Sequence, residues 1–162
     1  MIVISDTSPI INLAAINQLD LIPKLFAHII IPQAVFDEIT IKGFGKYGSS
    51  EILNAEWITV KQCTNTVLLN NLLLELDLGE AEAIALAIEM NTQSILLDES
   101  DGRTIALQYK LKPIGILGIL LEAKNKGLIP NVKDCIENLQ IIANFYISKP
   151  IYNHILQLAG EL

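Results

Sequence analysis

The sequence has few of the residues that build disulfide frameworks, zinc sites or membrane spans. Its two cysteines, Cys63 and Cys135, are far apart and have no partner at a metal-binding spacing. We therefore expect two ordinary buried thiols in a cytoplasmic protein. No apolar run reaches the ~20 residues that a membrane span needs. No basic region precedes the apolar N-terminal residues, so we expect neither a membrane segment nor a secretory signal.

Histidine and basic residues are also scarce. The two histidines, His28 and His154, lie far from any Gly-x-Ser-x-Gly turn, which argues against a serine hydrolase. The chain has 11 basic and 18 acidic residues and a net charge of −7, which argues against a generally basic nucleic-acid surface. A nuclease is still compatible with this charge, because cations bound by carboxylates reverse the local field.

What the sequence does contain is a set of short apolar strands that alternate with helices. Strands are predicted at residues 2–5, 28–32, 57–60, 94–97 and 112–116. Helices are predicted at residues 8–16, 18–26, 32–42, 66–76, 79–90, 100–110, 117–126, 131–146 and 149–160. The glycine-rich segment 43–50 is predicted to be a flexible loop. This alternation predicts a parallel sheet covered on both faces, within a single domain over residues 1–162.

Two acidic residues directly follow predicted strands. Asp6 follows the first strand, and Asp98 follows the strand at 94–97. Parallel strands end at the same edge of a sheet, where open α/β sheets place their chemistry. A buried carboxylate is unfavourable unless it is paired or binds a metal. Two helical acids, Glu38 and Glu80, are further candidates for the same place.

Each of these acids also has a purely structural explanation. Glu80 opens a helix, where the dipole favours a negative charge, and Glu38 can be an exposed helical acid. Asp6 can form a turn, Asp98 can cap a helix, and Glu82 is expected to be solvated. Four acids without a histidine cluster suit a hard cation such as Mg²⁺ or Mn²⁺. The spacing alone leaves both explanations open.

Five segments, in order along the chain, resemble PIN-domain ribonucleases, the fold of many toxins in VapBC-type toxin–antitoxin pairs. They are VISDTSPIINLA (3–14), VFDEI (35–39), LDLGEAEAIALA (76–87), ILLDESDGR (95–103) and PIGILGILLEAKNKGLI (113–129). The resemblance is closest to a bacterial and archaeal PIN-like subfamily of unknown function. It implies a three-layer α/β/α sandwich with a central parallel sheet, to which this chain adds C-terminal helices at about 131–160. It also implies a metal-dependent endoribonuclease with an RNA substrate and, for a toxin, an antitoxin partner.

The resemblance also assigns roles to individual residues. The implied catalytic acids are Asp6, Glu38, Glu80 and Asp98. The implied ligands of Mg²⁺ or Mn²⁺ are Asp6, Glu80, Asp98 and Asp101. The polar residues at positions that commonly support the first acid are Thr7, Ser8 and Asn12. The basic residues that we place nearest the substrate are Lys42, Lys46 and Arg103.

Some positions depart from the family's pattern. Leu96 and Ile116 stand where relatives usually have a hydroxyl residue, which removes two hydrogen-bonding groups near the acids. Glu80 stands where many relatives have aspartate. These departures favour an alternative, a catalytically weak or inactive PIN-like module that acts through partner or RNA binding. A phosphoacceptor receiver domain is not favoured, because Lys112 precedes the last strand and follows Asp98 too closely.

The chain also carries more leucine and isoleucine than one small sheet needs to cover it. The surplus lies in the predicted helix at 66–76 and in the C-terminal helices. Surplus apolar surface marks interfaces, and the family resemblance implies dimers. We therefore expect a homodimer.

Overall fold

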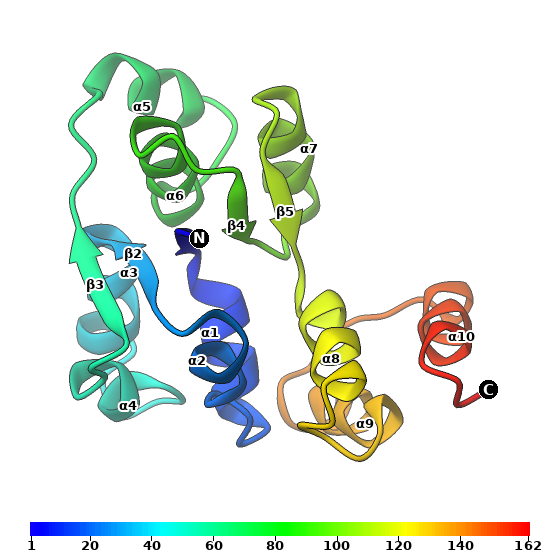
Figure 1. Cartoon of the computed structure of the whole chain (residues 1–162). Helices are drawn as coiled ribbons and strands as arrows, with labels where there is room; N and C mark the ends of the chain where they lie inside the picture. The colour runs from blue at the N-terminus through cyan, green and yellow to red at the C-terminus, as the bar shows by residue number, and fades with distance from the viewer.

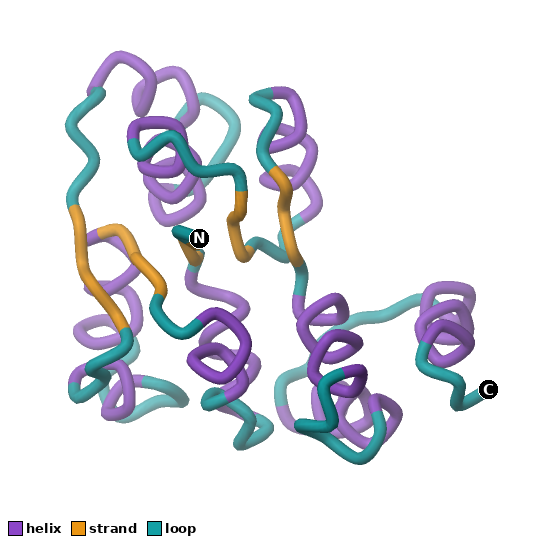
Figure 2. Tube along the Cα trace, in the orientation of Figure 1, coloured by secondary structure: helices purple, strands orange, loops and turns teal.

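The computed structural model describes residues 1–162 and is built on a five-stranded parallel sheet (Figure 1). The strands are β1 (Val3–Ser5), β2 (Ile29–Pro32), β3 (Ile58–Lys61), β4 (Ser94–Leu96) and β5 (Lys112–Ile114). Their order is β3-β2-β1-β4-β5, and every neighbouring pair is parallel. The first strand in the chain is therefore the central one, with β2 on one side and β4 on the other. These short strands are drawn in orange in Figure 2.

Ten α-helices and one π-helical turn connect and cover the strands. The elements before β4 are α1 (Thr7–Ala15), α2 (Leu21–Phe26), α3 (Gln33–Asp37), η1 (Glu38–Lys42), α4 (Ser49–Leu53), α5 (Thr66–Leu72) and α6 (Leu78–Glu89). Those after β4 are α7 (Ser100–Gln108), α8 (Ile116–Asn125), α9 (Val132–Ile142) and α10 (Lys149–Leu158). None of these helices has both the length and the apolar character that crossing a membrane requires.

Buried side chains form two cores, one on each face of the sheet. The larger, of 23 buried residues, includes Val3 and residues of α1, α8 and α9. The smaller, of 15 buried residues, includes Ile4 and residues of α6 and α7. Val3 and Ile4 enter different cores because successive side chains of a strand point to opposite faces. The predicted α/β/α sandwich with a central parallel sheet is therefore confirmed.

The boundaries of several predicted helices differ from those observed. The helix predicted at 32–42 is α3 followed by the π-helical η1. The predicted loop at 43–50 ends early, because Gly48 turns the chain with φ of 87° and α4 begins at Ser49. The helix predicted at 131–146 ends at Ile142, and Asn144 then adopts a left-handed conformation with φ of 52°.

A further boundary differs at the end of α5. The helix predicted at 66–76 stops at Leu72. Asp77 has an extended backbone, with φ of −71° and ψ of 170°, because it caps α6. The chain therefore has to leave the helical conformation before it reaches this residue.

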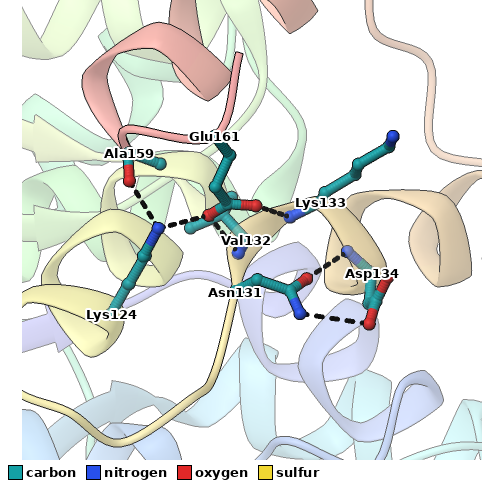
Figure 3. Close-up of polar contacts among 7 residues, drawn as sticks. All are labelled: Lys124, Asn131, Val132, Lys133, Asp134, Ala159 and Glu161. Carbon is teal, nitrogen blue, oxygen red and sulfur yellow. Dashed lines mark hydrogen bonds and ion pairs between the residues drawn. The ribbon is translucent and has the colours of Figure 1, made fainter.

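The C-terminal helix α10 is tied to α8 and α9 by a polar cluster centred on Glu161 (Figure 3). The Glu161 carboxylate accepts hydrogen bonds from the backbone N–H groups of Val132 (2.7 Å) and Lys133 (2.9 Å), at the start of α9. It also pairs with the Lys124 ammonium at 2.9 Å, which in turn donates to the carbonyl of Ala159. Partial burial raises the pKa of Glu161, but these donors outweigh it and hold the pKa below its ordinary value.

Candidate metal centre

Asp6 lies where the central strand ends and α1 begins. Its N–H donates to the carbonyl of Leu96 at 3.0 Å, which continues the pairing of β1 with β4 to the edge of the sheet. The Asp6 residue is 3% exposed, and its side chain makes no capping hydrogen bond to α1. An aspartate at this position usually accepts from the second or third N–H of the helix, but Pro9 supplies no N–H at the third position. The carboxylate is therefore buried without the partners that a helix cap provides.

Glu38 approaches Asp6 from η1. The Thr7 hydroxyl donates to Glu38 Oε2 at 2.7 Å, which orients that carboxylate toward the start of α1. Gly79, at the start of α6, faces the same oxygens. A Cβ atom at Gly79 would stand 3.2 Å from Asp6 Oδ1 and 3.3 Å from Glu38 Oε2. The absence of a side chain at Gly79 thus leaves a small gap bordered by carboxylate oxygens from two elements.

Glu80 combines a capping role with an unpaired oxygen. Asp77 Oδ1 accepts from the Glu80 N–H at 2.9 Å, and Glu80 Oε1 accepts from the Asp77 N–H at 3.3 Å, which together form a capping box. The other oxygen, Oε2, is buried and has no hydrogen-bond partner. It lies 3.0 Å from the point where a Cβ atom of Gly102 would stand. The structural explanation therefore accounts for one oxygen of this carboxylate and leaves the second free.

Asp98 follows β4 at the same edge of the sheet. As in Glu80, only one of its two carboxylate oxygens has a hydrogen-bond partner. Its Oδ1 accepts from the Ile116 N–H at 2.7 Å and so caps α8, while Oδ2 is buried without a partner. The Arg103 guanidinium is turned inward beside it and donates to the carbonyl of Leu97 at 3.0 Å. Gly115 makes room for both, because a Cβ there would stand 2.9 Å from Asp98 Oδ1 and 3.0 Å from Arg103 Nη1. Burial raises the pKa of Asp98. The hydrogen bond from the Ile116 N–H and the positive charge of Arg103 act in the opposite direction and lower it.

Burial and mutual repulsion strongly raise the pKa of two of these carboxyl groups. Burial is the main cause at Asp6, whose pKa is raised to about 7. The Thr7 N–H opposes the rise, and the charges of Asp77, Glu80 and Glu38 add to it. The pKa of Glu80 is also raised to about 7. Burial is the larger cause, and repulsion from the charge of Asp77 is the second. The structure has therefore gathered acids whose ionised forms lack a positive counter-charge.

The chemistry of this cluster fits a divalent cation that keeps part of its water shell. No ion pair of the chain involves Asp6, Glu38 or Glu80, and the gap at Gly79 is bordered by oxygen. Mg²⁺ needs only one or two carboxylates from a protein, because it keeps several waters and meets substrate phosphates. No group of three or more Asp, Glu, His or Cys side chains is arranged to hold a metal ion by itself. The cluster is therefore an open set of oxygen ligands and not a closed protein cage.

The remaining predicted residues lie outside this cluster or make no contact that links them to it. Asp101 is exposed in the first turn of α7 and has no hydrogen bond to the other acids. Ser8 and Asn12 are half-buried on α1, and their side chains make no hydrogen bond within the chain. Lys42 and Lys46 are exposed at the end of η1 and in the loop that follows.

Two acids at the start of α6 differ from what the sequence predicted: Asp77 takes part in the cluster, and Glu82 is buried. The signal for Asp77 was present, since an aspartate three residues before Glu80 is a capping-box pattern. Glu82, expected to be solvated, is only 6% exposed and accepts a hydrogen bond from the Cys63 thiol at 3.7 Å. That prediction was wrong because α6 is covered by the sheet and by α3 and α5, so almost no face of its first half meets water.

The fold and the acid cluster together define an α/β sandwich with an acidic site at the carboxyl edge of the central strand β1 and its neighbour β4. A family model for the PIN domain matches residues 2–161, nearly the whole chain. The chain therefore belongs to the PIN-domain family, which has a nuclease-type fold. No curated protein and no solved structure matches it.

Proposed function

We propose that this protein is a metal-dependent endoribonuclease that cleaves RNA phosphodiester bonds with Mg²⁺ or Mn²⁺. The observation that carries the proposal is the cluster of Asp6, Glu38 and Glu80, in which acids from three elements meet without a positive counter-charge. Such strongly perturbed acids in one place are typical of functional sites. Membership of the PIN-domain family supports the same reaction class.

In this proposal, Asp6 is the principal metal ligand. Glu80 Oε2 and Asp98 Oδ2, which have no hydrogen-bond partner, contact the ion through its bound waters. Asp101 would join them only through solvent, because it is exposed on α7. Glu38 is exposed and accepts a hydrogen bond from the Thr7 hydroxyl. We propose that its carboxylate orients a water molecule beside the metal ion. A bound divalent ion supplies a water of lowered pKa and offsets the charge of the phosphate.

The test is cleavage of a single-stranded oligoribonucleotide with Mn²⁺, with EDTA as the metal-free control. Asp6→Asn keeps the shape of the side chain but removes its charge. Loss of residues that only orient metal ligands costs ~10–100-fold, so loss of a ligand should reduce cleavage at least that much. Asp20→Asn is the matched control, because this acid is exposed at the start of α2 and pairs only with Lys24. A folded Asp6→Asn variant that cleaves at the wild-type rate would contradict the proposal.

The alternative function is a catalytically weak or inactive module that acts through partner or RNA binding. The observation in its favour is that Leu96 and Ile116 are fully buried and offer no hydroxyl beside Asp98. Arg103 also partly neutralises Asp98 in the absence of metal. Binding of Mn²⁺ by the wild type without cleavage of any RNA would decide for this alternative.

For the biological setting, we propose a cytoplasmic toxin that forms a homodimer and is held by an antitoxin protein. Both cysteines are free thiols, as is usual in a reducing compartment. Exposed apolar side chains on α5, just after it and in the C-terminal part of the chain support an interface; they include Val67, Leu74, Ile141, Tyr146 and Leu158. A monomeric mass by light scattering at ~10 µM would contradict the dimer, since stable interfaces of standard size hold at lower concentrations.

A further inference from the structure

Arg103 brings a positive charge to the Asp98 side of the acidic site. It is half-buried on α7, and its guanidinium donates to the carbonyl of Leu97 at 3.0 Å. The other N–H groups of the guanidinium make no hydrogen bond within the chain. No ion pair joins Arg103 to a carboxylate. Holding one carbonyl therefore accounts for only part of what this side chain can bind.

A glycine makes room for the guanidinium beside Asp98. A Cβ atom at Gly115 would stand 2.9 Å from Asp98 Oδ1 and 3.0 Å from Arg103 Nη1, so both groups border the same small space. Gly115 caps α8 directly after β5, and α7, which carries Arg103, runs beside β5 (Figure 1). The backbone therefore lets a cation of the protein itself stand next to Asp98 without a direct ion pair.

The carboxylates of the site differ in the charges that surround them. The charged groups that act on Asp6 are all acids, and each of them raises its pKa. Asp98 has one acidic neighbour, Glu99, and the positive charge of Arg103 acts against it. Positive charge from the chain is therefore missing around Asp6 and present beside Asp98.

This difference decides how many metal ions the site can take. Nucleases with two metal ions hold them roughly 3.5–4 Å apart, so each ion needs its own share of negative charge. On the Asp98 side, Oδ1 already accepts from the Ile116 N–H at 2.7 Å, and a divalent ion would be repelled by Arg103. On the Asp6 side, the chain supplies no such repulsion. The two sides of the site therefore differ in their capacity for a cation.

We propose that Arg103 stands in for a second metal ion, so that the site takes one divalent ion on the Asp6 side and keeps the guanidinium as its cation on the Asp98 side. The inference rests on the proposed function and specifies the metal content of that site. In two-metal sites, the second ion contacts the reacting phosphate. The unpaired N–H groups of Arg103 take this role by donating to a phosphate oxygen of the RNA.

The number of bound ions can be measured without RNA, from the electron paramagnetic resonance signal of free Mn²⁺ during titration of the full chain. The wild type should bind one Mn²⁺ ion per chain. Arg103→Gln removes the charge beside Asp98. A charge at this range changes the binding of a proton by about tenfold or more, so the affinity of the Asp98 side for a cation should rise at least as much. This variant should therefore bind a second ion.

Three further variants separate the charge of Arg103 from its other contacts. Arg103→Lys keeps the charge and should bind one ion. Lys110→Gln is the matched control, because Lys110 is exposed just after the far end of α7 and its loss changes the net charge equally. It should also bind one ion. Adding Asp98→Asn to Arg103→Gln should abolish the second ion, since asparagine keeps the oxygen that accepts from the Ile116 N–H but carries no charge.

The inference is overturned if the wild type binds two Mn²⁺ ions, a result that does not depend on whether any variant folds. It is also overturned if a folded Arg103→Gln variant binds Mn²⁺ with the number and affinity of the wild type, because the side chain then only holds the carbonyl of Leu97. A second ion in Arg103→Lys would overturn it too, since the charge is kept. Failure of the proposed function has a different signature: the wild type binds one Mn²⁺ ion and cleaves no RNA.

Discussion

Two groups of carboxylates in this protein have opposite surroundings. Glu161 accepts hydrogen bonds from two backbone N–H groups and pairs with Lys124, and its pKa lies below the ordinary value (Figure 3). At the edge of the sheet, Asp6 and Glu80 lie among other acids, and burial raises the pKa of each to about 7. The charge of Glu161 is balanced by donors and an ammonium group within the chain, whereas the charges of Asp6 and Glu80 are not.

This difference separates a structural carboxylate from candidate functional ones. A buried charge that is fully hydrogen-bonded can hold elements together, as Glu161 holds the C-terminus to α9. A buried charge without partners lowers the stability of the folded chain. Such groups are typical of sites where a ligand supplies the missing charge. The comparison therefore predicts that the same substitution has opposite effects in the two regions.

The largest expected effect comes from filling the gap at Gly79. Gly79→Ala would place a methyl group 3.2 Å from Asp6 Oδ1 and 3.3 Å from Glu38 Oε2, where a cation or its water is expected. We expect Mn²⁺ affinity, measured by titration calorimetry, and RNA cleavage to fall by about 10–100-fold.

The control for this variant is Gly118→Ala. Gly118 also lies in a helix, but its added Cβ would make only an ordinary contact, 3.6 Å from a methyl carbon of Ile114. It should bind Mn²⁺ and cleave RNA as the wild type does. A Gly79→Ala variant with unchanged Mn²⁺ affinity would show that the metal lies elsewhere.

The next largest effect is expected on thermal stability. The Tm in EDTA is measured for one variant in each region, Glu161→Gln and Asp6→Asn. Glu161→Gln loses a charge-assisted network and should cost about 1–2 kcal/mol, or roughly 2–8 °C in Tm. Asp6→Asn removes a buried charge that has no positive counter-charge in the chain, so its Tm should be unchanged or higher. Added Mn²⁺ should then raise the Tm of the wild type and of Glu161→Gln, but not that of Asp6→Asn. If Asp6→Asn lowers the Tm in EDTA as much as Glu161→Gln does, the two regions do not differ in this way.

The smallest effect is in the pH dependence of the Glu161 cluster. Because the pKa of Glu161 is lowered by folding, its contribution to stability is complete above the ordinary value of 4.5 and is lost as pH falls through the folded value. The difference in Tm between the wild type and Glu161→Gln should therefore be constant near neutral pH and close in acid. Melts of both proteins in EDTA across this range measure it. If the difference in Tm between the wild type and Glu161→Gln stays the same in strong acid, the charge of Glu161 is not what stabilises the fold.

Much of the fold follows from local patterns in the sequence. The strands are short apolar runs bounded by polar or turn residues, and each was predicted to within two residues at either end. The parallel sheet followed from their alternation with helices. That the strands before Asp6 and Asp98 are neighbours was shown only by the structure. The organisation as one domain and the roles of the site residues stay predictions. The boundaries at 42–49 depended on a π-helical turn and a left-handed glycine, which apolar periodicity does not indicate.

The sequence by itself therefore determined the alternation of strands and helices, the parallel sheet and the edge at which the acids emerge. Only the tertiary structure decided which carboxylate oxygens have partners. Asp98 caps α8 because β5 brings Ile116, 18 positions away in the chain, beside the end of β4. Glu161 finds its N–H donors 28 and 29 positions away, at the start of α9. Propensity, periodicity and capping act over a few neighbouring residues, whereas the partners of a buried charge depend on how distant elements pack.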